Sequence, residues 1–339
     1  YIRQFGAVPG LMEHYSAAQP VELPSVRRTR IRAAELGRES SLFGRAEARL
    51  ALRANVKQAF YMVLRRRAEI GLAQENLRLV QELRNRVGVQ VEVGEAARLE
   101  LTRADAEVAT ARTLANSARL RYRNAVASLR TAVGAPLPAS VDARGDLEIS
   151  RKLPPLDRLI AEVLAQHPTI AQADAEIRRA EAVLDSEKAQ RKPQPWLRGE
   201  YERQPDLGFF RFGLTLPLPL WNKREGPIAE AEAALARARA QADLRRIELT
   251  AAMESAYGLY EVAGEQVASF EQGVLKGAEE ALKAAEAAFR FGERGIIEVL
   301  DAQRVLRTVR EDFLSAQFDL QAALIQVELL RGIGAEVNK

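Results

Sequence analysis

Two acidic residues in the second half of the chain have the type and spacing to act on charged solutes. Glu298 and Asp301 lie three positions apart in a stretch of helical composition, so their side chains would share one helical face. Carboxylates along a water-filled passage select cations through their field, without making or breaking bonds. The ordinary alternative is a solvated helix face, because 28% of the residues are charged. The pair therefore indicates ion selection at most, and not catalysis.

Patterns typical of enzymes and metal sites are missing from the sequence. It has no cysteine and only two histidines, which excludes disulfides and thiolate metal sites and leaves little for imidazole ligation. We interpret His14 as exposed polar surface and His167, which precedes Pro168, as a turn or capping residue. No glycine-rich phosphate loop or nucleophile elbow is present. We therefore expect no enzyme, no cofactor and no metal site.

The charge balance gives little support for nucleic-acid binding. The 50 Lys and Arg residues nearly balance the 46 Asp and Glu residues, which leaves a formal net charge of +4. Four arginines, Arg27, Arg28, Arg30 and Arg32, could contact phosphates. Beside a membrane they would meet lipid headgroups or the acidic faces of neighbouring subunits. We therefore expect no nucleic-acid partner.

An alternating pattern predicts strands with one apolar face. From Phe210 onward every second residue is large and apolar, while Arg211 and Thr215 fall on the other face. A sheet packed on a soluble core would show the same pattern, but the chain offers no other layer to cover this face. Aromatic residues towards strand ends resemble an interfacial belt, and about ten residues is the length of a tilted membrane strand. The expected lipid-facing residues are Phe210, Phe212, Leu214, Leu216, Leu218, Leu220 and Trp221, and the expected belt is Trp196, Tyr201 and Trp221.

Two very long helices are predicted, at about 25–87 and 227–291. Both segments lack internal proline and are rich in good helix formers, in a chain with only 6% aromatic residues. Each would be on the order of 90 to 100 Å long. Apolar residues spaced alternately by three and four form two adjacent stripes on the second helix. Such a helix can contact a partner on each side, as a ring of helices requires.

An internal duplication organises the chain. Residues 56–62 match 253–259 at an offset of about 197, and the match of 93–95 with 291–293 has an offset one residue larger. We divide the chain into a first repeat at 1–134, a linker and equatorial helix at 135–194, and a second repeat at 195–339. The first repeat comprises a β-hairpin at 1–24 and a helical hairpin at 25–134. The second comprises a β-hairpin at 195–222 and a helical hairpin at 224–334. Four strands cannot close a barrel alone and lipid does not tolerate an open edge, so a lipid-facing sheet requires oligomerisation.

These features resemble the TolC-like outer-membrane factors of bacterial tripartite efflux and secretion systems. The most specific mark is the stretch 290–302, which is similar to the periplasmic tip of the family, where a glycine turn leads into a run like aspartate-valine-leucine-aspartate-alanine. The first copy, 86–101, keeps the glycine and the carboxylate. The strand-to-helix junction at 214–231 resembles that of CzcC-like members, which serve heavy-metal resistance pumps.

The resemblance implies an α+β membrane fold. Long coiled-coil hairpins would form a periplasmic α-barrel, and two β-hairpins per chain would contribute to the twelve-stranded outer-membrane β-barrel of a homotrimer. The function implied is a passive exit duct, located in the outer membrane and extending into the periplasm. Its partners would be an inner-membrane RND pump, a periplasmic adaptor and outer-membrane lipid, and its expected cargo is heavy-metal cations.

The resemblance also assigns roles to individual residues. Arg294 resembles the gate-constraining arginine of the family, and Glu100 is its expected charge partner. In a trimer, Glu298 and Asp301 would form two acidic rings above the tip. The expected adaptor-docking residues are Gly94, Glu95, Gly292, Glu293 and Gly295, although Gly94 and Gly292 would serve equally well as helix ends.

Several alternatives stay open at this point. The chain begins at Tyr1 without methionine, so we expect the targeting sequence, any lipid-acceptor cysteine and the first-repeat counterpart of the helix near His167 to lie upstream. The same architecture could export drugs or serve type I secretion, because cargo choice can lie in other subunits. A soluble coiled-coil scaffold is the competing structural class.

Overall fold

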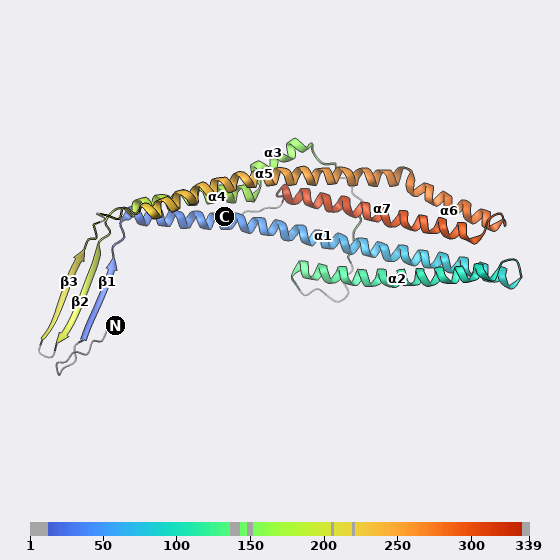
Figure 1. Ribbon diagram of the computed structural model, residues 1–339, viewed down its shortest axis with the longest axis horizontal. Coiled ribbons are helices and arrows are strands. Elements are labelled where there is room, and N and C mark those ends of the chain that lie inside the picture. Colours follow the sequence, from blue (N-terminus) through green and yellow to red (C-terminus); the bar gives the residue numbers. More distant parts are fainter. Residues whose placement is uncertain (1–12, 136–142, 148–151, 205–206, 219–220, 334–339) are drawn as a thin grey trace. The chain divides into compact units, whose positions relative to one another are not determined.

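The computed structural model describes residues 13–135, 143–147, 152–204, 207–218 and 221–333. The strand expected before Glu13 and the predicted lipid-facing residue Leu220 lie outside this part. The described elements are β1 (Glu13–Pro20), α1 (Pro24–Glu92), α2 (Arg98–Val133), α3 (Leu156–Gln166), α4 (Pro168–Ala189), β2 (Trp196–Gln204), β3 (Leu207–Thr215), α5 (Glu225–Ser269), the π-helix η1 (Phe270–Val274), α6 (Leu275–Arg290) and α7 (Ile296–Leu330) (Figure 1). Every helix among these residues is too short or too polar to cross a bilayer.

Packing divides the chain into two units. One, the sheet unit, comprises residues 1–46, 168–248 and 337–339, and its described part holds the three strands, α4 and the first parts of α1 and α5. The other, the tip unit, comprises residues 47–167 and 249–336 and holds α2, α3, α6, α7 and the remainder of α1 and α5. Each unit has its own apolar clusters.

The sheet is antiparallel, in the order β1-β2-β3. Tyr201 pairs with Tyr15 on one side and Phe210 on the other, and this register fixes which residues share a face. Tyr201 thus lies inside β2, stacked on the ring of Tyr15 and tilted against the ring of Phe210, and the expectation that it marks a strand end was wrong. Strand β3 ends at Thr215, before the predicted alternation does, because Pro217 and Pro219 cannot donate to a strand ladder.

The long helices form where the sequence predicts them. Helix α1 has 69 residues, and α5, η1 and α6 follow one another without a break from Glu225 to Arg290. Both long helices begin at proline-containing segments, because a first turn needs no backbone donor from proline. Between the repeats lie two helices, α3 and α4, which separate at Pro168 because proline disfavours helical backbone in the residue before it.

Two helical hairpins pack against each other in the tip unit. Helices α1 and α2 form one hairpin, and α6 and α7 form the other (Figure 1). Apolar side chains from all four helices make one buried cluster, which consists of Leu83, Val87, Ala104, Ala278, Leu282, Ile296, Val299, Leu300 and Leu306. Burial of this cluster joins the two hairpins close to their turns.

A pair of adjacent isoleucines tests this cluster. Ile296 is fully buried and Ile297 is 45% exposed. We expect Ile296→Ala to lower the free energy of unfolding by about 2–5 kcal/mol, because it leaves a cavity in the cluster. Ile297→Ala should cost no more than about 0.5 kcal/mol. Guanidinium unfolding of the detergent-extracted protein, followed by circular dichroism, measures both, and equal losses would contradict the packing described.

Candidate functional site

The two helical hairpins end in turns of the same geometry. Gly94 and Gly292 both have positive φ angles, 83° and 73°, which favour glycine. In each turn the next residue bonds back across the helix end: the Glu95 amide donates to the Gln90 carbonyl at 2.7 Å, and the Glu293 amide donates to the Ala288 carbonyl at 3.0 Å. The five expected docking residues are all exposed.

Each turn also presents an apolar side chain that the sequence interpretation did not single out. Val93 and Phe291 immediately precede the two glycines, and they are 64% and 76% exposed. An exposed apolar residue at the same place in both turns was visible in the repeat alignment, because the two residues occupy matching positions. The turns therefore offer apolar contacts beside backbone that can approach a partner closely.

The expected gate residues gather around the start of α7. Arg294 lies 4.0 Å from Glu298, four residues along the chain. A Cβ atom placed on Gly295 would lie 3.6 Å from the Glu298 carboxylate and 3.9 Å from that of Glu100, so both carboxylates reach the same helix N-terminus. Negative groups are favoured at such an end. Within the single chain, the partner of Arg294 is Glu298 and not the expected Glu100, because the i,i+4 spacing brings Glu298 back towards the turn.

Asp301 is engaged by a residue that the sequence interpretation missed. Arg304 donates to Asp301 at 3.2 Å and to Glu107 at 2.8 Å. The side chain of Glu107 is 10% exposed, whereas that of Asp301 is 61% exposed. The hydrogen bond to Glu107 raises the pKa of Arg304 above its ordinary value. Glu107 on α2 could not be found from sequence, because nothing local distinguishes it from the many solvated glutamates.

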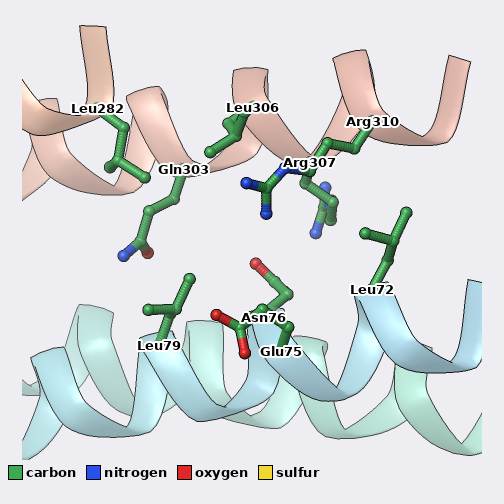
Figure 2. Close-up of a pocket in the computed structure, with 9 residues that line it drawn as sticks. All are labelled: Leu72, Glu75, Asn76, Leu79, Leu282, Gln303, Leu306, Arg307 and Arg310. Carbon is green, nitrogen blue, oxygen red and sulfur yellow. The ribbon is translucent and has the colours of Figure 1, made fainter. Parts of the chain in front are cut away.

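A small cavity separates the two hairpins further along the helices. Side chains from α1, α6 and α7 line it, and Figure 2 shows polar groups of α1 and α7 facing one another across it. Its volume is about 20 Å³, which is room for a single water. Gln303 is buried there, and its Oε1 has no hydrogen-bond partner in the described chain. Hydrogen bonds from Arg78 hold the pKa of Glu75, also in the lining, below its ordinary value.

The sheet has two chemically opposite faces. One face carries Phe210, Phe212 and Leu214, which are 71%, 83% and 67% exposed. Gly199 lies opposite Phe212 on this face, and a Cβ atom placed on Gly199 would be in ordinary van der Waals contact with the Phe212 ring, at 3.6 Å. The predicted residues Leu216, Leu218 and Trp221 are exposed beyond the end of β3.

The opposite face of the sheet carries an ion-pair cluster, which the sequence interpretation noticed only at Arg211, and at the other end of β3 it carries the apolar Leu207 and Phe209. Glu200 lies 3.3 Å from Arg211 and 3.6 Å from Arg198. Ser16 pairs with Glu200 and lies on this face too. The sheet can therefore contact hydrocarbon on one side and water on the other.

Neither histidine has the surroundings of a metal site. His14 is exposed in β1, as expected. His167 caps the C-terminus of α3 and is buried, and burial lowers the pKa of its imidazole. Among the residues that the structure describes, no three metal-ligating side chains come together.

The shared arginine at the start of α7 gives a stability test. We expect Glu107→Ala to lower the free energy of unfolding by about 1–3 kcal/mol, because it removes a mostly buried charge-assisted hydrogen bond. Asp301→Ala should cost less than about 1 kcal/mol, as exposed ion pairs do. Chemical unfolding of the two variants under identical conditions makes the comparison. A larger loss for Asp301→Ala would show that Glu107 does not anchor Arg304.

Sequence comparison relates the chain to known transport proteins. Residues 13–135 and 159–332 match the model of the family described as outer membrane efflux protein. The cobalt-zinc-cadmium resistance protein CzcC of Cupriavidus metallidurans is 27% identical, over 92% of this chain and 75% of that protein. The pyoverdine export outer membrane protein OpmQ of Pseudomonas aeruginosa is 24% identical, over 97% of this chain and 70% of that protein.

Structural comparison gives the same fold. The CmeC outer membrane channel of Campylobacter jejuni superposes with a TM-score of 0.80, at 14% identity, over 97% of this chain and 79% of that chain. The predicted resemblance and fold class are confirmed by these matches.

Proposed function

Because the chain belongs to the outer membrane efflux protein family, we propose that it forms the exit duct of a tripartite efflux system as a homotrimer. In this proposal the sheets of three chains close one twelve-stranded barrel, and the helices form a periplasmic tube. The observation that carries it is the sheet, whose apolar and charged faces suit a wall between lipid and water. Lipid does not tolerate unpaired strand edges, so such a sheet needs further copies for closure.

The duct would be passive. Neither the ion-pair cluster at the start of α7 nor the one-water cavity can drive transport. Energy would come from an inner-membrane pump of the RND type. A periplasmic adaptor would dock on the paired turns, where Val93 and Phe291 are exposed next to Gly94 and Gly292.

The cluster at the start of α7 would act as the gate. In a trimer, Glu298 and Asp301 of each chain would form acidic rings, and Arg294 would restrain the turn through Glu298. An exposed pair is worth at most about 1 kcal/mol. Three copies acting together could still bias an aperture between two states.

The cargo that we propose is heavy-metal cations. Support comes from the similarity to CzcC over most of both chains and from acidic groups at the proposed gate. The similarity to OpmQ favours a second candidate, the export of pyoverdine, which is the cargo that the name of OpmQ gives. The two candidates share one architecture, so their difference would lie in the pump and adaptor.

Single-channel conductance tests the duct and its gate. We expect the wild-type trimer to give small openings in planar bilayers, reduced further by millimolar divalent cations. Arg294→Ala should raise the conductance about twofold to tenfold, because it removes a restraint of up to about 1 kcal/mol per chain. Asp301→Ala should remove the block by divalent cations.

Asp312→Ala is the matched control for Asp301→Ala, because it removes an exposed carboxylate elsewhere on α7. It should leave both conductance and block unchanged. Absence of channels from protein that needs no detergent would contradict the duct. Unchanged conductance in Arg294→Ala would contradict the gate alone.

A lysine placed on each face of the sheet tests the lipid wall. We expect Phe212→Lys to destabilise membrane assembly by about 2–4 kcal/mol, because the charge enters hydrocarbon. Ser16→Lys introduces the same residue on the charged face and should be tolerated. The readout is the yield of heat-modifiable trimer in the outer-membrane fraction. Equal yields from both variants would show that the sheet does not face lipid.

A further inference from the structure

Cations gather where the sheet meets the helices. Three arginines lie in the first turns of α1, and three more cations lie at and just beyond the end of α4. We call this set the junction cations: Arg27, Arg28, Arg32, Lys188, Arg191 and Lys192. All six side chains are exposed.

Backbone contacts hold these segments at one end of the sheet. Pro20, the last residue of β1, pairs with Trp196, the first residue of β2. The Val21 amide donates to the Pro195 carbonyl at 2.8 Å. Arg191 Nε donates to the Lys223 carbonyl at 3.1 Å, which joins the end of α4 to the segment before α5. The junction cations therefore belong to one region of the sheet unit.

The chain supplies little compensating charge there. Two other cations of the region are paired: Arg30 binds Glu22 through two hydrogen bonds of 2.9 and 2.7 Å, and Arg224 binds Glu187. The junction cations, by contrast, form no ion pair within 4.0 Å of a carboxylate among the described residues; Arg27 adds only a weaker electrostatic effect to the hydrogen bond by which Arg30 lowers the pKa of Glu22. The sequence has no acidic residue from 24 to 34 or from 188 to 199.

The position of the cations matches a lipid–water interface. Leu197 and Leu214 form the last apolar rung at this end of the sheet, and Trp221 is 91% exposed nearby in sequence. Tryptophan beside Lys and Arg is typical of the membrane interface. At about 1.5 Å per residue, Arg27 to Arg32 lie within roughly 12 Å of the start of α1. The headgroup layer has a depth of roughly 5–8 Å on each side of the hydrocarbon, so the backbone of Arg27 and Arg28 lies within it. The side chain of Arg32 can reach it, because helical side chains lean towards the N-terminus of the helix.

We propose that the junction cations bind the phosphate groups of anionic phospholipids in the leaflet that surrounds this end of the sheet. This inference rests on the proposed function, which places the sheet in the membrane. Guanidinium groups bind phosphate through paired hydrogen bonds, and lysines add charge. The competing partner is an acidic face of a second copy, which would leave no preference among lipids.

Tryptophan fluorescence provides a direct test, because the chain contains only two tryptophans, Trp196 and Trp221. Trp196→Phe leaves Trp221 as the single reporter at the junction. The protein is reconstituted in vesicles with phospholipids brominated near the carbonyl end of the acyl chain, which quench tryptophan on contact. We expect phosphatidylglycerol to bind at least about threefold more strongly than phosphatidylcholine, given the attraction of each cation to anionic lipid. The preference should fall in high salt.

The variant that tests the assignment is Arg27→Gln combined with Arg28→Gln and Arg32→Gln. We expect its preference for phosphatidylglycerol to fall by at least about half, because three of the six junction cations are removed. The matched control replaces Arg119, Arg121 and Arg123 by Gln, three exposed arginines on α2 in the tip unit, and should keep the preference.

The possible failures differ from one another. Equal quenching by both lipids in the Trp196→Phe protein would overturn the lipid assignment while leaving the duct intact. A preference that the triple change does not reduce would do the same. A preference that the control also loses would overturn it too, because charge alone would then account for binding. No quenching by any lipid would overturn the membrane sheet and this inference with it.

Discussion

The register of the sheet is the constraint on which the rest of the molecule depends. Side chains alternate along a strand, so a shift of one residue would exchange the two faces completely. The contacting rings of Tyr15, Tyr201 and Phe210 support that register across all three described strands. Because of it, Phe212 faces away from the ion pair of Glu200 with Arg211.

The helical part depends on a different match, between the two copies of the repeat. The offset between the copies increases by one residue between Val56, which matches Met253, and Gly94, which matches Gly292. The π-helix η1 lies within that interval, and the Leu275 amide donates to the Phe270 carbonyl five residues back. A π-turn accommodates one extra residue without breaking a helix. It thereby absorbs the insertion and lets both hairpins end in the same glycine turn.

Much of this was predictable because it depends on local rules. Proline-free segments gave the long helices, and the glycine turns at Gly94 and Gly292 were visible as a repeated motif. The end of β3 was misjudged, because hydrophobic alternation continues through prolines that cannot join a ladder. Two contacts of the single chain were not predicted, that of Arg304 with Glu107 and that of Arg294 with Glu298. The first depends on which helices pack together, and the second on how far each side chain extends.

The charge at the start of α7 is set by unequal burial. Three carboxylates, those of Glu107, Glu298 and Asp301, lie within 4.0 Å of two guanidinium groups, and the carboxylate of Glu100 lies near Gly295. The mostly buried Glu107 binds Arg304 more strongly than Asp301 does, because the loss of a desolvated partner lowers the stability of the fold more than the loss of an exposed one. Asp301 is therefore held only loosely. In the proposed duct, a loosely held carboxylate at this position would be the group best placed to favour cations.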